Sequence, residues 1–138
     1  MKTTVRPKIL IVEDRAEVLI AMILSLERAG FCVFGVQTGM DGIRLSKTEE
    51  FDLVILDVNL PEQDGFEVFA WLKQEFRYSR TPIIFISDHW NDEKRRRARE
   101  LGAADCLDKP FDAPAFVRRI FSHVRTIPAW PDKNVPDL

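Results

Sequence analysis

The sequence predicts one α/β domain in which helices cover both faces of a parallel β-sheet. Its 138 residues are the usual length of a single domain. Short, mostly apolar runs alternate five times with longer amphipathic segments, and those at residues 9–12, 53–56 and 83–86 are apolar throughout, as in strands that are buried on both faces. Strands and helices that alternate in this way build a parallel sheet, because each crossover helix packs on one of its faces.

The first half of the chain supplies three of the strands and two of the helices. After the first strand, apolar residues recur at helical spacing until Gly30, which ends that helix. Thr38 is a suitable N-cap for a second helix, which continues through Lys47. We expect the strands of this half at residues 8–12, 31–36 and 53–56.

The second half supplies two strands and three helices. A turn at residues 61–65 leads into a helix with an apolar face. Gly102 ends a polar helix over residues 92–101, and Asp112 is a suitable N-cap for the last helix. We expect the strands of this half at residues 83–86 and 105–107.

Composition excludes several classes of protein. The chain has 20 Lys and Arg against 22 Asp and Glu, a formal net charge of −2, so no overall basic field favours direct binding to nucleic acid. Cys32 and Cys106 lie far apart without clustered histidines, which argues against a zinc site and is typical of reduced, buried thiols. The longest apolar stretch, residues 19–24, is much shorter than the roughly 20 residues of a membrane span.

The start of the chain does not have the pattern of a signal peptide. The first apolar run stops at Glu13 and Asp14, which is too short for a signal peptide. We therefore expect a cytoplasmic location and no membrane partner. The expected organisation is an N-terminal extension over residues 1–7, one domain over residues 8–125, and a C-terminal tail or truncated linker with three prolines over residues 126–138.

Polar residues gather where the predicted strands end. Because the carboxyl ends of parallel strands meet at one edge of a sheet, and binding sites form there, we expect these side chains to lie close together. They are Glu13 and Asp14 after the first strand, Asp57 and Asn59 at the third, Ser87 at the fourth and Lys109 after the fifth.

Such a set of side chains suits phosphoryl transfer to an aspartate. Crowded carboxylates repel one another, and a hard divalent cation such as Mg²⁺ relieves that repulsion. An Asp carboxylate can attack phosphorus and form an aspartyl phosphate. The cation and a nearby Lys neutralise charge on the transferring group.

Five motifs occur in a fixed order, each at a predicted strand end or in the turn that follows one. They are Glu13-Asp14, Asp57, Pro61 with Asp64-Gly65, Ser87, and Lys109-Pro110-Phe111. In this order they resemble the receiver domain of two-component response regulators, over about residues 8–125. The resemblance implies a flavodoxin-like doubly wound sheet of five parallel strands in the order 2-1-3-4-5.

The resemblance implies a signalling domain of a phosphorelay rather than an enzyme. Asp57 would accept a phosphoryl group from a phosphohistidine on a sensor histidine kinase or a histidine phosphotransfer protein. Asp14 and Asp57 would bind Mg²⁺ through their carboxylates, Glu13 would help through a water, and Asn59 would contribute its backbone carbonyl.

The resemblance also implies a switch. Lys109 would pair with Asp57 and then with the phosphoryl group, and the Lys109–Pro110 peptide would be cis. Ser87 would turn inward to hydrogen-bond a phosphoryl oxygen and would move its loop. A downstream output protein or domain would read the shifted face near the fourth and fifth strands, and a second copy of the chain is among the suggested partners.

Two residues depart from the family pattern. Asp88 follows Ser87, where receivers usually have Ala or Gly. It either faces the pocket and opposes a phosphoryl dianion, or points to solvent or caps the next helix, and we favour the second interpretation. Cys106 stands in the fifth strand, where receivers usually have Tyr or Phe, and Trp90 is the candidate substitute for that aromatic side chain.

Two other functions compete with the phosphorylated switch. A pseudo-receiver would keep the fold but bind partners without taking phosphate, as the changes at Asp88 and Cys106 suggest. A phosphatase of the haloacid-dehalogenase type also uses an Asp nucleophile and Mg²⁺. It needs an Asp as general acid two residues later, however, where this chain has Asn59.

Two surface features suggest where partners act. The helix over residues 92–101 has only Ala98 and Leu101 as apolar anchors, so we expect it to be weakly packed, mobile and part of the output face. On the first helix, Ile20 and Leu24 fall outside the apolar stripe, so they are either partly exposed or buried by a neighbouring helix or loop. In the family, this helix docks on the helical bundle that donates phosphate.

Overall fold

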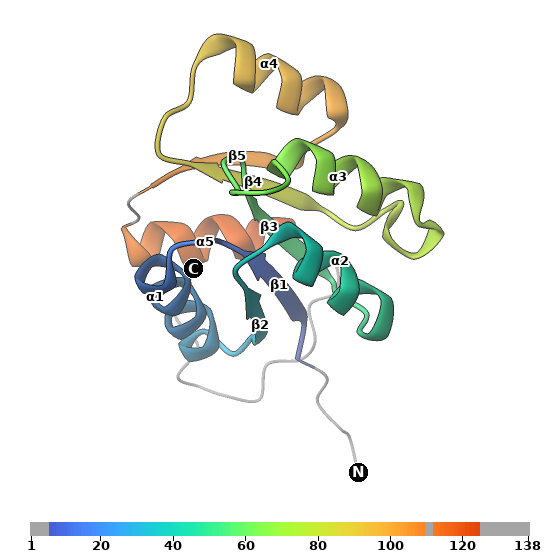
Figure 1. Ribbon diagram of the computed structural model, residues 1–138. Coiled ribbons are helices and arrows are strands. Elements are labelled where there is room, and N and C mark those ends of the chain that lie inside the picture. The colour runs from blue at the N-terminus through green and yellow to red at the C-terminus, as the bar shows by residue number, and fades with distance from the viewer. Residues whose placement is uncertain (1–5, 110–111, 125–138) are drawn as a thin grey trace.

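The computed structural model describes residues 6–109 and 112–124, and in this part strands and helices alternate along the chain (Figure 1). None of the helices described is long and apolar enough to cross a bilayer. The elements are β1 Lys8–Val12, α1 Ala16–Arg28, β2 Cys32–Val36, α2 Gly39–Thr48, β3 Leu53–Asp57, α3 Gly65–Gln74, the 3-10 turn η1 Phe76–Tyr78, β4 Ile83–Ser87, α4 Asp92–Leu101, β5 Asp105–Asp108 and α5 Ala113–His123.

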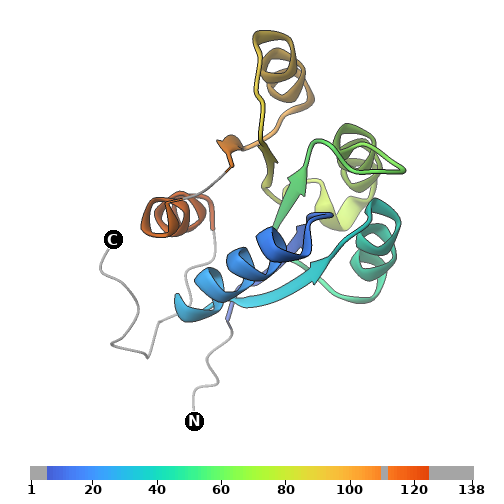
Figure 2. The ribbon, with the colours of Figure 1, turned by 60° about the vertical axis from the view of Figure 1, so that its left-hand side comes forward.

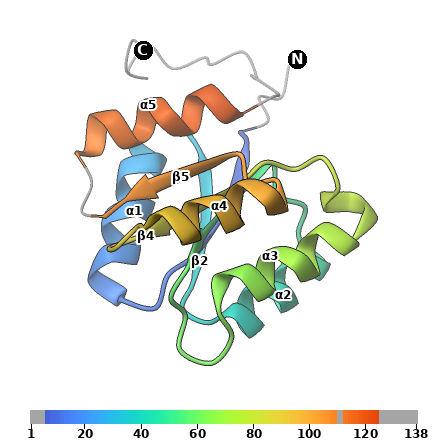
Figure 3. The same cartoon turned by 90° about the horizontal axis from the view of Figure 1, so that it is seen from above.

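The five strands form one parallel sheet in the order β2-β1-β3-β4-β5, which confirms the expected flavodoxin-like fold. Helices α1 and α5 cover one face, and α2, α3 and α4 lie on the other (Figures 2 and 3). A hydrophobic core lies on each face of the sheet, and successive residues of β1 point into opposite cores. Ile9 and Ile11 pack toward α1 and α5, whereas Leu10 and Val12 pack toward α2 and α3.

The strand order places a site at the carboxyl ends of β1 and β3. The chain starts at β1, goes to one edge at β2, and returns past β1 to β3, so the connections leave these two strands in opposite directions. A crevice opens at such a switch point in an open parallel sheet. Strands β1, β3 and β4 are almost wholly buried, and this rigid base holds whatever follows their last residues.

Most helix ends match the sequence. The Thr38 hydroxyl accepts the Asp41 N–H at 3.1 Å and caps α2. Gly102 closes α4 with a φ of 94°, a left-handed conformation that favours glycine. Asp112 occupies the N-cap position of α5, but its side chain makes no capping hydrogen bond, so that part of the expectation was wrong. The short turn η1 was not predicted.

Helix α4 is attached to the sheet by few apolar contacts. Of its residues only Ala98 is buried, and Leu101, expected as a second anchor, is 38% exposed. Two guanidinium groups lie over aromatic rings instead. Arg97 stands 4.3 Å from the Phe66 ring centre and Arg95 stands 5.3 Å from that of Trp90. Weak packing of this helix is therefore observed, while its mobility stays a prediction.

Candidate functional site

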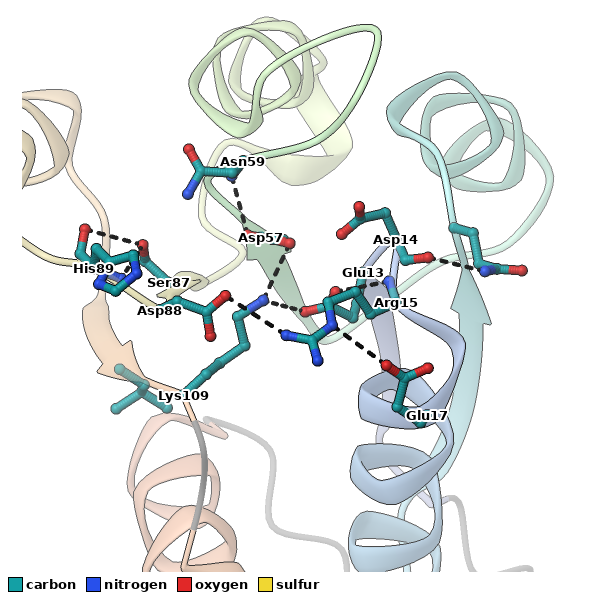
Figure 4. Close-up of polar contacts among 12 residues, drawn as sticks. Glu13, Asp14, Arg15, Glu17, Asp57, Asn59, Ser87, Asp88, His89 and Lys109 are labelled. Carbon is teal, nitrogen blue, oxygen red and sulfur yellow. Dashed lines mark hydrogen bonds and ion pairs between the residues drawn. The ribbon is translucent and has the colours of Figure 1, made fainter.

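Four of the predicted site residues meet at the carboxyl edge of the sheet (Figure 4). Glu13 and Asp14 directly follow β1, Asp57 is the last residue of β3, and Lys109 follows β5. One carboxylate oxygen from each of the three acids lies within 4.8 Å of the others. Glu13 and Asp57 are buried, and Asp14 is half-buried. The parallel sheet thus gathers three acids and one base from distant parts of the chain.

The Lys109 ammonium group is the buried cation of this cluster. Its Nζ lies 2.6 Å from Glu13 Oε1 and 3.2 Å from Asp57 Oδ2. Burial acts to lower the pKa of Lys109, but the hydrogen bond to Glu13 and the charge of Asp57 outweigh it, and the pKa lies above its ordinary value. Lys109 is therefore charged at neutral pH, yet it is shared between two carboxylates, with a third close by.

Asp57 carries the most perturbed carboxyl group of the cluster. Burial raises its pKa from 3.8 to about 7, and the charge of Glu13 acts in the same direction. The Asn59 N–H, 3.0 Å from Oδ1, and the Lys109 ammonium oppose this rise without cancelling it. Without a metal, the carboxyl group is therefore partly protonated at neutral pH. An added cation would favour its ionised, nucleophilic form.

The loop after β3 fixes the position of Asp57. The Gly65 N–H donates to the Val58 carbonyl at 2.9 Å, and a Cβ at residue 65 would collide with the main-chain oxygen of Asp57. Only glycine permits this close approach. The Asp64 carboxylate accepts the Glu67 N–H at 2.9 Å and caps α3. The Asp64-Gly65 motif thus folds the loop tightly back against the end of β3.

The Ser87 hydroxyl turns toward its own loop. It lies 3.3 Å from the His89 carbonyl, to which it donates, and 3.2 Å from the His89 N–H, from which it accepts. Ser87 is fully buried at the end of β4. To reach a group on Asp57, the Ser87 hydroxyl has to break its hydrogen bonds to the His89 main chain. A movement of this hydroxyl therefore releases the loop after β4.

The Asp88 side chain is exposed, as the favoured interpretation expected, but it does not cap α4. The N-cap of α4 is Asn91, whose side chain accepts the Lys94 N–H at 2.7 Å. The Asp88 carboxylate is 41% exposed and lies 3.8 Å from a nitrogen of Arg15. It is thus paired with the residue that follows the acidic pair of β1.

Cys106 and Trp90 lie together at β5. Burial raises the pKa of the Cys106 thiol, which keeps it protonated at neutral pH. The Trp90 indole N–H donates to the Leu107 carbonyl at 2.8 Å, and the half-buried Trp90 and Cys106 side chains pack against the same hydrophobic core. An aromatic side chain therefore does contact β5, but it comes from the loop after β4.

The donor set of this cluster fits Mg²⁺. This ion prefers a few carboxylate oxygens, and it keeps water or phosphate oxygens in its other positions. Glu13, Asp14 and Asp57 bring three carboxylates together where a single ammonium balances them, so the cluster has unbalanced negative charge when ionised. Nitrogen or sulfur ligands, which zinc and copper favour, are missing from this cluster.

Sequence reasoning did not identify two residues that support the site, Arg15 and Gln37. The Arg15 N–H donates to Glu13 Oε2 at 2.9 Å, and the Gln37 side chain donates to the Asp14 carbonyl at 3.0 Å. Gly65 contributes the close approach described above. The turn motif marked Gly65, whereas contacts from Arg15 and Gln37 depend on loops whose path is set by the whole sheet.

The model of the response regulator receiver domain family matches residues 9–121 of this chain. The matched span lies within the predicted domain of residues 8–125 and contains every predicted site residue. The order of motifs that suggested a receiver domain is therefore supported independently of the individual motifs.

Known proteins resemble the chain in sequence and structure. The transcriptional activator protein IrlR of Burkholderia pseudomallei is 39% identical over 118 residues, which cover 86% of this chain and 50% of IrlR. The chain thus spans about half the length of this relative. The chemotaxis protein CheY4 of Vibrio cholerae superposes with a TM-score of 0.84 at 26% identity, covering 86% of this chain and 99% of CheY4.

A third neighbour shares the fold. The receiver domain of the sensor histidine kinase PA1611 of Pseudomonas aeruginosa has a TM-score of 0.80 at 24% identity, covering 88% of this chain and 100% of that domain. That structure has a magnesium ion coordinated in its active-site cleft.

Proposed function

This chain belongs to the response regulator receiver domain family, and on that premise we propose that Asp57 accepts a phosphoryl group from a phosphohistidine. The donor is a sensor histidine kinase or a histidine phosphotransfer protein. An oxygen of Asp57 bonds to phosphorus while the bond between phosphorus and the histidine nitrogen breaks. The observation that carries this proposal is the buried Asp57 carboxylate, gathered with two further acids and one buried ammonium at the carboxyl edge of the sheet.

Mg²⁺ is the proposed cofactor. Asp14 and Asp57 hold it through carboxylates, Glu13 assists, and Asn59 contributes its backbone carbonyl. When bound, the ion neutralises charge on the transferring phosphoryl group. Asn59 and Lys109 orient the Asp57 carboxylate through hydrogen bonds, and Lys109 supplies a fixed positive charge beside it.

The switch we propose moves the loop after β4. Phosphorylation adds negative charge and acceptor oxygens at Asp57. The Ser87 hydroxyl leaves the His89 backbone to satisfy them, and the loop that carries Trp90 moves with it. Helix α4 follows this loop and has little apolar contact with the sheet, so it moves at a low energetic cost.

Hydrogen exchange tests the mobility of α4. We expect its amides to exchange much faster than those of β1, β3 and β4, and phosphorylation to change their rates. Protection of α4 equal to that of the central strands would contradict a moving output face.

Two exposed apolar side chains on α1 supply a docking surface for the donor. Ile20 is 54% exposed and Leu24 is 47% exposed, which is unusual for large apolar residues one turn apart. Their helix begins at the acidic pair of the site. A downstream protein or domain then reads the face formed by α4 and β5, and a second copy of this chain is a further proposed partner.

Intact-mass measurement tests the proposed phosphorylation. The protein is incubated with acetyl phosphate and Mg²⁺, and we expect a gain of one phosphoryl mass. Asp57→Asn abolishes the gain because the nucleophile is lost, whereas Asp41→Asn, which removes a surface carboxylate on α2, retains it.

The other functions give different results in the same assay. A folded wild-type protein that gains no mass with acetyl phosphate or phosphoramidate would be a pseudo-receiver. Hydrolysis of a small phosphate ester by the pure protein would instead support the phosphatase.

A further inference from the structure

An ion pair between Arg15 and Asp88 lies beside the acidic cluster. Arg15 is the N-cap residue of α1 and follows Asp14 in the chain, and its main chain is fixed by its hydrogen bond to Glu13. A guanidinium nitrogen lies 3.8 Å from Asp88 Oδ2, and its Nε lies 3.3 Å from Glu17 Oε1. Figure 4 shows this pair reaching from the start of α1 to the end of β4.

The pair borders the same cavity as the buried cation of the site. A cavity of about 470 Å³ is lined by the charged side chains of Arg15, Glu17, Asp88 and Lys109, and also by apolar side chains of α1 and α5. The Lys109 ammonium in turn contacts Asp57. Charges on Arg15 and Asp88 therefore lie close to the group that is proposed to gain a phosphoryl group.

The charge on Asp88 is unfavourable for that reaction. Asp88 follows Ser87, whose hydroxyl is proposed to approach a phosphoryl oxygen, and the cluster already holds three carboxylates for one ammonium. A donor with a negative phosphoryl group is repelled by each further uncompensated carboxylate. Arg15 places a positive charge 3.8 Å from the Asp88 carboxylate and so compensates it.

We propose that Arg15 is a positioning residue for the phosphorylation of Asp57, and that it acts by neutralising and holding Asp88. This inference rests on the proposed function. Asp88, the unusual residue after Ser87, thereby has a partner that neutralises its charge. Arg15 in turn helps to set how fast a negatively charged donor reacts with Asp57.

The rate of phosphorylation tests the pair. With acetyl phosphate and saturating Mg²⁺, we expect Arg15→Gln to react roughly 3- to 10-fold more slowly than the wild type, the size expected for one unbalanced charge at a partly exposed site. Asp88→Asn added to Arg15→Gln restores most of the rate, because Glu17 is then the remaining carboxylate that Arg15 paired with. Arg15→Lys retains most of the rate.

Two outcomes of the rate measurement would overturn the proposal. One is a wild-type rate in Arg15→Gln. The other is a double variant as slow as Arg15→Gln alone, since Arg15 would then act on the donor and not through Asp88. Lys8→Gln is the matched control, because Lys8 forms a partly exposed pair with Glu49 at the opposite edge of the sheet. This control is expected to leave the rate unchanged.

Mg²⁺ affinity measured by calorimetry gives a readout that needs no phosphorylation. Arg15→Gln leaves extra negative charge beside the cluster, so we expect it to bind Mg²⁺ roughly 3- to 10-fold more tightly, and Asp88→Asn to bind it more weakly by a similar factor. The double variant returns toward the wild type. A damaged fold would weaken both Mg²⁺ binding and phosphorylation. The proposal instead predicts that Arg15→Gln binds Mg²⁺ more tightly but is phosphorylated more slowly.

The two readouts separate this proposal from the proposed function. If the wild-type protein gains no phosphoryl group, the phosphoacceptor function fails, and the Mg²⁺ affinities still decide whether the pair acts on the cluster. Unchanged Mg²⁺ affinity in both single variants would place the pair outside the electrostatic reach of the cluster and would overturn the inference.

Discussion

Two carboxylates at the sheet, Asp57 and Asp105, have opposite electrostatic environments. Asp57 ends β3 and shares its single buried cation with Glu13. Asp105 begins β5 and has partners of its own. It receives two hydrogen bonds from the Arg119 guanidinium, one of them at 2.8 Å, and lies 2.9 Å from His123 Nε2.

The pKa values follow this difference. At Asp105, burial acts to raise the pKa, but the hydrogen bonds from Arg119 and His123 outweigh it, and the pKa lies below its ordinary value. At Asp57, burial prevails and the pKa rises to about 7. The comparison teaches that a carboxylate with a structural role is fully compensated, whereas the one at the candidate site is left short of positive charge and can gain a cation.

Removing the only buried cation of the site has the largest expected effect. Lys109→Ala leaves Glu13 and Asp57 without their ammonium, and breaking a buried pair in this way costs about 3–5 kcal/mol of the free energy of unfolding. Urea denaturation at pH 8 without Mg²⁺ measures it. Added Mg²⁺ should recover part of the loss, because a ligand of the folded state stabilises it. A loss below about 1 kcal/mol would contradict a buried, charge-compensating role for Lys109.

Removing the Asp57 carboxylate is expected to raise the free energy of unfolding, which is opposite in sign to the effect of Lys109→Ala. The pKa of Asp57 is raised in the folded state, so its favourable contribution is complete below the pKa of the unfolded chain and is lost as pH rises through about 7. Asp57→Asn is therefore expected to be about 1–3 kcal/mol more stable than the wild type at pH 8 without Mg²⁺, and no more stable at pH 4. Denaturation curves at the two pH values check both signs. Equal stability at pH 8 would show that the ionised carboxylate is well tolerated.

Breaking the ion pair between Arg119 and Asp105 has the smallest expected effect on the free energy of unfolding. Arg119 is 53% exposed on its side chain, so Arg119→Gln is expected to cost about 1 kcal/mol at pH 7. Because the pKa of Asp105 is lowered in the folded state, this contribution is fully present above the pKa of the unfolded chain and is lost as pH falls through the lowered pKa of Asp105. Thermal unfolding at pH 7 and pH 3 measures the difference. If Arg119→Gln lost more stability than Lys109→Ala, the expected difference between the Asp105 and Asp57 environments would be contradicted.

The sheet and the gathering of the acidic cluster were predictable from the sequence for a simple reason. Buried parallel strands are apolar throughout, so their ends are visible as the first polar residues, and Glu13, Asp57 and Ser87 stand at those positions. The carboxyl edge of a parallel sheet then brings these residues together whatever the loops do.

The remaining details depend on contacts that no local pattern records. Asn91 caps α4 and Asp88 pairs with Arg15 because of the path of the loop after β4, although Asp88 is as good a capping residue as Asn91. Trp90, in the loop after β4, reaches the Leu107 carbonyl on the neighbouring strand β5. The turn η1 is only three residues long, which is too short for a periodic signal.

The titration of the Asp57 carboxyl group is the most direct test of an under-compensated site. Its side-chain ¹³C resonance, identified by comparison with Asp57→Asn, is followed from pH 3 to pH 9 with and without Mg²⁺. We expect a midpoint near 7 without the metal, as burial dictates, and a midpoint well below that value with it. A midpoint near 3.8 without Mg²⁺, unchanged when the ion is added, would contradict the account.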